Sequence, residues 1–279
     1  MVRESGSAEK LLANMLRRVE VESSLSALYI RRAEKEKHLS RIIPEYSEDW
    51  ENDPYVKRSE RRGDEKMIGA EMVLLVAERR DLDEAEKVFR ASLQQMIGSL
   101  PAPNEEDAAS PAARLKAITA QIDRMDMAAK SGQKIIRATS HIKRCADQAM
   151  QFRLGSGGLS EPLKAALYTT DQMGPVLRDF YQLLGEASFP LTLRDKIKYC
   201  QVGGSDWMWE MFDYDLMGLF TRLFHRPDAA RFSEVDVELL GIRYRIYSAM
   251  SRIAGWRSSL TKELIDLYCE LSAPETKEA

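Results

Sequence analysis

The sequence predicts an all-α protein: an elongated bundle of about six main helices, several of them longer than roughly 30 residues. Two observations predict this class. Apolar residues recur at steps of three and four through most of the chain, and no segment alternates between apolar and polar residues as a strand would. Glycine and proline gather in a few clusters, which leaves long uninterrupted stretches between them.

The segment 207–224, WMWEMFDYDLMGLFTRLF, is expected to form the helix that the others close over. It holds six aromatic residues in eighteen positions. Its apolar residues recur every three or four positions, as on one face of an amphipathic helix. Charged residues such as Glu210 and Asp213 make this segment a poor candidate for a membrane span. It is therefore expected to be a core helix.

The N-terminal part predicts one long helix from Ala8 to Ile43, which Pro44 ends because the residue before a proline avoids helical geometry. Within it, RRAEKEKH at 31–38 is charged at almost every position. A helix that is polar all round projects into solvent or lies across a partner. Residues 45–66 are a charged stretch, for which we expect a partly disordered connector.

A strongly apolar helix is predicted over 67–80. Next, Asp81 and Glu84 have the spacing of a capping box, so residues 67–96 form either two helices or one bent helix.

Residues 81–93 place Ala85, Phe89 and Ser92 at the spacing seen in the second helix of a tetratricopeptide repeat, and the segment resembles such a helix. The resemblance covers one helix. No second copy occurs about 34 residues away, and such repeats need several copies to be stable. A repeat architecture is therefore not expected.

Ser110 followed by Pro111 is a favoured helix start, and a helix of about forty residues should follow, to about Arg153. Three further helices complete the expected set: one from Ser160 that is interrupted near Gly174 and Pro175, a short one over 192–203, and a last one from Ser233 to about Leu271. The chain is expected to divide into an N-terminal helical hairpin with its charged connector, 1–100, and a C-terminal bundle, 101–279, although one continuous domain is also possible.

Charge and cysteine content narrow the class of protein. The formal net charge is −3, so the molecule as a whole does not bind polyanions through bulk electrostatics. Cys145, Cys200 and Cys269 lie far apart, which fits reduced thiols better than a disulfide framework. We identify no secretory signal and no transmembrane window. These features predict a cytoplasmic protein.

The clearest functional signal is a row of five basic side chains in the helix that starts at Pro111. They are spaced by four, three, four and three residues, which places them on one helical face: Lys130, Lys134, Arg137, His141 and Arg144. Residues 127–153 hold six Lys or Arg against one acid, a local charge of +5. Such a row can follow a phosphate backbone or meet an acidic partner. The alternative is a solvated face that pairs with acids elsewhere in the chain.

The last helix repeats this pattern more weakly, because it interleaves basic and aromatic residues that could clamp single-stranded nucleic acid or could equally be core. These residues are Arg243, Tyr244, Arg245, Tyr247, Arg252, Trp256, Arg257 and Lys262.

The potential metal ligands in the sequence occur as isolated pairs. They are His141 with Cys145, Glu34 with His38, Asp123 with Asp126, and Asp213 with Asp215. None has the density of ligands that a metal site needs, and the phosphate-binding and catalytic motifs are missing from the sequence. The sequence therefore assigns no catalytic residue, no metal ligand and no cofactor.

The function that these observations favour is a non-catalytic, cytoplasmic structural or adaptor protein, which acts through protein–protein interaction or self-assembly. Two alternatives stay open. The chain could be a helical nucleoprotein that binds nucleic acid with the row 130–144. It could also be an all-α enzyme with a small-molecule pocket beside the aromatic helix.

Overall fold

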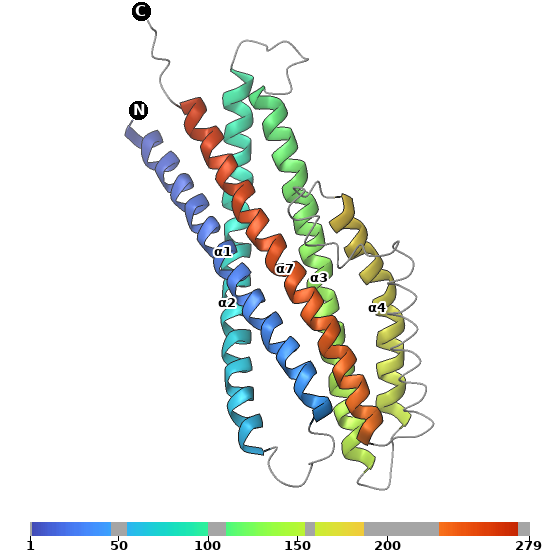
Figure 1. Cartoon of the computed structure of the whole chain (residues 1–279). Helices are drawn as coiled ribbons and strands as arrows, with labels where there is room; N and C mark the ends of the chain where they lie inside the picture. Colours follow the sequence, from blue (N-terminus) through green and yellow to red (C-terminus); the bar gives the residue numbers. More distant parts are fainter. Residues whose placement is uncertain (1, 46–54, 100–109, 154–159, 187–228, 273–279) are drawn as a thin grey trace, which may run out of the picture. The chain divides into compact units, whose positions relative to one another are not determined.

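The computed structural model describes residues 2–45, 55–99, 110–153, 160–186 and 229–272. These residues form five helices and no strand: α1 (Val2–Glu45), α2 (Tyr55–Gly98), α3 (Pro111–Arg153), α4 (Ser160–Glu186) and α7 (Ala229–Ser272) (Figure 1). The all-α class is confirmed, with five helices in the described residues where about six were expected for the whole chain. The expected short helix at 192–203 and the aromatic segment 207–224 lie outside the described residues.

Helix α3 begins and ends where the sequence predicts. The backbone N–H of Ala113 donates to Ser110 Oγ at 3.3 Å, and the N–H of Arg114 donates to the Ser110 carbonyl at 3.0 Å. Ser110 is therefore the N-cap, and Pro111 occupies the first turn, where its missing N–H costs nothing.

Helices α1 and α4 continue past two predicted breaks, and α2 is continuous where either two helices or one bent helix was expected. α1 ends at Glu45, one residue beyond Pro44, and α2 starts at Tyr55, inside the expected connector. α2 also passes through Asp81 as a single helix, because the capping-box spacing there has no glycine or proline next to it to break the helix. α4 runs through Pro175, whose ring is exposed; the residue four positions earlier, Asp171, is exposed as well, so water can take up the carbonyl that loses its bond.

The chain forms two compact units, each assembled from several helices. Unit 1 comprises residues 1–28, 66–125 and 251–279, and unit 2 comprises residues 29–65 and 126–250. Helices α1, α2, α3 and α7 are long enough to contribute to both units.

In unit 1, small residues bring α1 and α7 close together. Ser26 Oγ donates to the Ser251 carbonyl at 2.9 Å, and Ser251 Oγ donates to the Ser26 carbonyl at 2.8 Å. A Cβ atom added at Gly255 would stand 3.3 Å from Ser26 Oγ. The apolar core of unit 1 includes Met15, Val21, Leu25, Phe89, Leu93, Ile122 and Leu264, each almost completely buried.

In unit 2, α3 packs tightly against α4 and α7 at Gly132. A Cβ atom at this position would lie 2.4 Å from Met250 Sδ and 3.0 Å from Phe180 Cε2. Only glycine fits this close approach without displacing both neighbours. Gly132 therefore fixes which side of α3 faces the interior.

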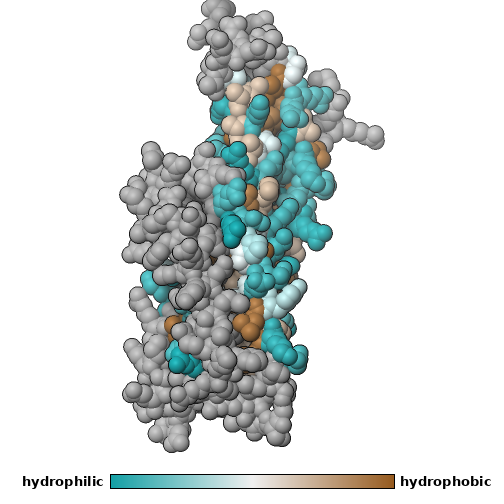
Figure 2. All heavy atoms as spheres, turned by 90° about the vertical axis from the view of Figure 1, so that its right-hand side faces the viewer, coloured by the Kyte–Doolittle hydropathy of each residue, from teal (hydrophilic) through white to brown (hydrophobic). Residues whose placement is uncertain are grey.

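The outer faces of the helices are mainly polar. The face drawn in Figure 2 is mostly hydrophilic where its residues are described, with hydrophobic side chains scattered among them. None of the helices in the described residues combines the length and the apolar content that a membrane-spanning helix needs.

The packing at Gly132 leads to a matched pair of predictions. Gly132→Ala should lower the free energy of unfolding by about 1 kcal/mol, because overpacking outweighs the gain in helix propensity. Gly241→Ala on α7, where nothing lies within 4 Å of the new Cβ, should raise it by about 0.5–1 kcal/mol. Urea denaturation followed by circular dichroism measures both. Equal effects of the two changes would contradict the close approach at Gly132.

Candidate functional site

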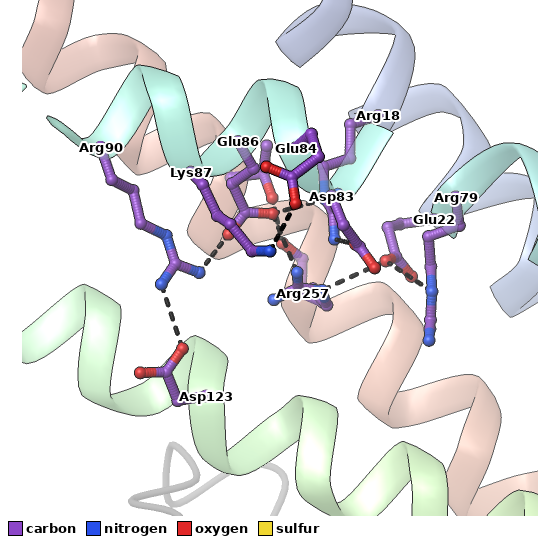
Figure 3. A network of polar contacts seen from close by, with 11 residues as sticks. Arg18, Glu22, Arg79, Asp83, Glu84, Glu86, Lys87, Arg90, Asp123 and Arg257 are labelled. Atoms are coloured by element: carbon purple, nitrogen blue, oxygen red, sulfur yellow. Dashed lines mark hydrogen bonds and ion pairs between the residues drawn. The ribbon is translucent and has the colours of Figure 1, made fainter. Parts of the chain in front are cut away.

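The interior of unit 1 contains a network of buried charges centred on Glu86 of α2 (Figure 3). Its carboxylate pairs with three arginines. Arg18 Nε of α1 lies 2.6 Å from Glu86 Oε2, and Arg257 Nη2 of α7 lies 2.9 Å from the same oxygen. Arg90, one turn along α2, pairs with Oε1. The side chains of Arg18, Arg257 and Glu86 are at most 3% exposed, so the charges are screened from water and depend on one another.

The network extends from Glu86 to the surface through its arginines. Arg18 Nη2 lies 2.7 Å from Asp83 Oδ1, and Arg90 Nη1 lies 3.0 Å from Asp123 Oδ1 of α3. Arg257 Nε lies 3.2 Å from Oε1 of the buried Glu22 on α1. One polar network therefore joins all four helices of unit 1, as Figure 3 shows.

Unit 2 contains a smaller network of the same kind. Glu36 Oε1 lies 2.8 Å from Arg32 Nε on α1 and 2.9 Å from Arg243 Nη2 on α7. The ring of Tyr247 lies beside both guanidinium groups, with its centroid 5.8 Å from Arg32 Cζ and 5.9 Å from Arg243 Cζ. The aromatic ring adds cation–π attraction to the ion pairs.

The two networks share one sequence pattern. On α1, Arg18 and Glu22 are followed fourteen residues later by Arg32 and Glu36, and on α7 Arg243 is followed fourteen residues later by Arg257. In each unit the glutamate pairs with the arginine of α7. Fourteen residues are two heptads, so the pattern returns to the same side of each helix.

These networks bear on two interpretations of the sequence, and they correct the first of them. In the charged stretch 31–38, Arg32 and Glu36 are buried, and Glu36 pairs with Arg243 of α7. One side of this stretch therefore faces the interior of the protein. On the last helix, where the basic and aromatic residues were expected either to clamp nucleic acid or to be core, Arg243, Tyr247 and Arg257 are buried, as the core alternative expects. The signal that could have revealed this is the repeated Arg-x-x-x-Glu spacing on α1.

The predicted basic row on α3 lies on the surface. Its five members, Lys130, Lys134, Arg137, His141 and Arg144, are all exposed. Gly132, which faces α4 and α7, lies about 200° round the helix from Lys130. The row therefore points away from these two helices.

The basic row differs in its ion pairing from Lys143, a neighbouring lysine on α3. Lys143 Nζ lies 2.9 Å from Asp236 Oδ1 of α7 and 3.7 Å from Asp147 Oδ1. Within the described part of the chain, no carboxylate pairs with the four Lys and Arg side chains of the row. The alternative of a solvated face that pairs with acids elsewhere in the chain stays a prediction, because acids such as Glu48, Asp49 and Glu51 lie outside the described residues.

A second surface, on α2, is one that the sequence analysis missed. Three large apolar side chains point outward: Met67 is 73% exposed, Val73 67% and Leu74 70%. Ala70 and Ala77 are exposed between them, while Ile68 and Phe89 face the core. We call Met67, Ala70, Val73, Leu74 and Ala77 the outer apolar face of α2. The signal was present in 67–80, because this helix is apolar on both sides.

The predicted ligand pairs do not gather into a larger cluster. His141 Nε2 lies 3.6 Å from Cys145 Sγ, and burial raises the pKa of the Cys145 thiol, while the charge of Arg144 lowers it by less. A protonated thiol is a poor metal ligand. Glu34 and His38 are exposed, and no group of three potential ligands occurs among the described residues.

One of the two acidic pairs, Asp123 with Asp126, lies in the described residues, and the other, Asp213 with Asp215, does not. Asp123 forms an ion pair with Arg90, so its carboxylate belongs to the structural network of unit 1. Asp213 and Asp215 lie in the aromatic segment, outside the described residues, as does the pocket expected beside that segment. The enzyme alternative therefore stays a prediction.

Comparison with known proteins adds no relationship: no family model matches the chain, and neither a curated protein nor a solved structure matches it.

The buried network predicts unequal effects of two arginine substitutions. Arg257→Met removes a counter-charge from both Glu22 and Glu86 and should lower the free energy of unfolding by about 3 kcal/mol. Arg17→Met, which removes exposed ion pairs with Glu20 and Glu78, should have a much smaller effect. Chemical denaturation of both variants tests this. Comparable losses of unfolding free energy in the two variants would show that the buried ion pairs stabilise the fold no more than the exposed ones.

Thiol reactivity gives a second check. In a Cys200→Ala background, Cys269, which is exposed, should react with a disulfide reagent at about pH 8 at least roughly tenfold faster than the buried Cys145. Unfolding in guanidinium should make both thiols react at similar rates. Fast reaction of both in the folded protein would contradict the burial of Cys145.

Proposed function

We propose that the protein is a non-catalytic, cytoplasmic adaptor that binds an amphipathic helix of another protein on the outer apolar face of α2. The observation that supports this is the exposure of Met67, Val73 and Leu74 in a fold whose other apolar side chains largely face inward. Contiguous exposed apolar surface on a soluble helix is characteristic of an interaction site.

The spacing of the face fits a helix as partner. Met67, Ala70, Leu74 and Ala77 follow each other at steps of three, four and three, which is the a and d spacing of a coiled coil. The alanines leave room for large side chains of the partner between Met67 and Leu74. A second helix can therefore lie along α2 with its own apolar seam inserted into this face.

Charges on the two edges of the face specify the partner's chemistry. Lys66 and Arg80 lie along one edge, and Glu71 lies along the other; all three are exposed. Glu78 is less available, because the Arg17 guanidinium at 2.6 Å engages its carboxylate and lowers its pKa. The complementary helix carries acids toward Lys66 and Arg80 and a basic residue toward Glu71.

The exposed apolar side chains supply part of the binding energy. Burying a large apolar side chain contributes about 1.5–3 kcal/mol, so the three exposed side chains contribute on the order of 5 kcal/mol before the entropy of association is subtracted. The complementary charges mainly fix the direction of the bound helix.

A designed peptide tests the proposal. A fluorescent helical peptide with leucine at its a and d positions, acids on one edge and lysines on the other should bind the wild-type protein. Val73→Glu/Leu74→Glu should weaken binding at least roughly 30-fold, because two charges enter the seam. Leu16→Glu, a change at an exposed leucine of α1, is the matched control and should leave binding unchanged.

Three other outcomes would decide the role of the charged edges, of the apolar face and of self-association. A peptide with its charged edges exchanged should bind more weakly, and equal binding would remove the role of Lys66, Arg80 and Glu71. Equal binding to both protein variants would reject the face itself. Sedimentation that shows dimers lost in Val73→Glu/Leu74→Glu would assign the face to a second copy of this chain.

A further inference from the structure

We propose that the basic row on α3, Lys130, Lys134, Arg137, His141 and Arg144, binds the phosphate backbone of a nucleic-acid duplex without reading its base sequence. This surface belongs to unit 2 and is separate from the apolar face of α2, which belongs to unit 1. The inference therefore does not depend on the proposed protein partner.

The geometry of the row suits a polyanion. From Lys130 to Arg144 it extends about 21 Å along α3, within an arc of about 80°. A DNA duplex carries one negative charge per roughly 1.7 Å of its axis, so a row of this length faces several phosphates at once. The side chains are long enough to reach neighbouring phosphates from one straight helix.

The charges of the row are available for binding. Its four Lys and Arg side chains are exposed and form no ion pair within the described residues, whereas Lys143 on the same helix is held by Asp236. Binding to phosphates therefore breaks no ion pair between described residues. The gain comes from counterions released by the nucleic acid, which makes the affinity fall steeply with salt.

The surroundings of the row favour nucleic acid over an acidic protein or a membrane. Ile135 and Ile142 of this stretch are fully buried, Ile136 and Ala138 are partly buried, and no apolar residue between 130 and 144 is exposed. The outward-facing arc of α3 from 130 to 144 thus presents charged groups and no exposed apolar side chain. Protein interfaces, by contrast, have an apolar core, and membrane-bound helices insert an apolar face. Contacts to a phosphate backbone need nothing beyond positive charge and donors.

The same arc favours duplexes over single strands. Single-stranded nucleic acid is usually held by aromatic side chains on which its bases stack. The residues of α3 between 130 and 144, all of them described, include no Phe, Tyr or Trp. A duplex presents its phosphates on the outside and needs no stacking surface.

Fluorescence anisotropy of labelled DNA and RNA duplexes of mixed sequence, across a KCl series, tests the proposal. With four phosphate contacts, log K should fall with log salt at a slope of about −3.6, which is roughly a 150-fold loss between about 50 and 200 mM. Lys134→Gln/Arg137→Gln should halve the slope. Lys116→Gln/Lys262→Gln removes the same charge from exposed positions outside the row and should leave the slope unchanged.

Several results would overturn the proposal. These are no binding, equal loss in the row variant and in the matched control, equal or tighter binding of single strands, and equal binding of poly-glutamate or phosphatidylserine vesicles at the same salt. Thermal melting of each variant confirms that it is folded. Because Val73→Glu/Leu74→Glu leaves the row intact, its effect on duplex binding should be nil, and failure of one proposal can be told from failure of the other.

Discussion

The carboxylate of Glu86, shared by arginines from α1, α2 and α7, is the contact on which unit 1 depends most. Removing a carboxylate from water costs several kcal/mol unless positive groups take the place of the water. Each helix must therefore be rotated and shifted so that its arginine reaches the same two oxygens. Apolar packing alone tolerates several such arrangements, whereas this contact accepts one.

Such buried charges contribute more to the specificity of helix pairing than to stability. Apolar side chains of similar size at Arg18, Glu86 and Arg257 could give an equally stable interior, since replacing a whole buried ion network is often neutral. They would not distinguish one helix pairing from another. The reciprocal bonds between Ser26 and Ser251 act in the same direction, because they require close approach at one level of α1 and α7.

Sequence patterns predicted the helices well and the surfaces in part. The class, the limits of α3 and the exposed row 130–144 all follow from spacing, because a local pattern determines which residues share a helix face. The inward direction of Arg32 and Arg257 did not follow, since burial depends on a partner carboxylate on another helix. The outer apolar face of α2 was hidden for the opposite reason: the apolar residues of 67–80 lie on more than one side of the helix, and spacing does not show which side stays uncovered.

The repeat of the buried charges at fourteen residues on α1 and α7 has a consequence for how these helices find each other during folding. A misalignment by one heptad would separate Glu22 from Arg257 and Glu36 from Arg243, so both ion pairs between α1 and α7 would be lost. A misalignment by two heptads would bring Arg243 opposite Glu22 and preserve one salt link. In that alignment Arg257 would lie away from Glu22 and Glu86, so both of its buried ion pairs would be lost.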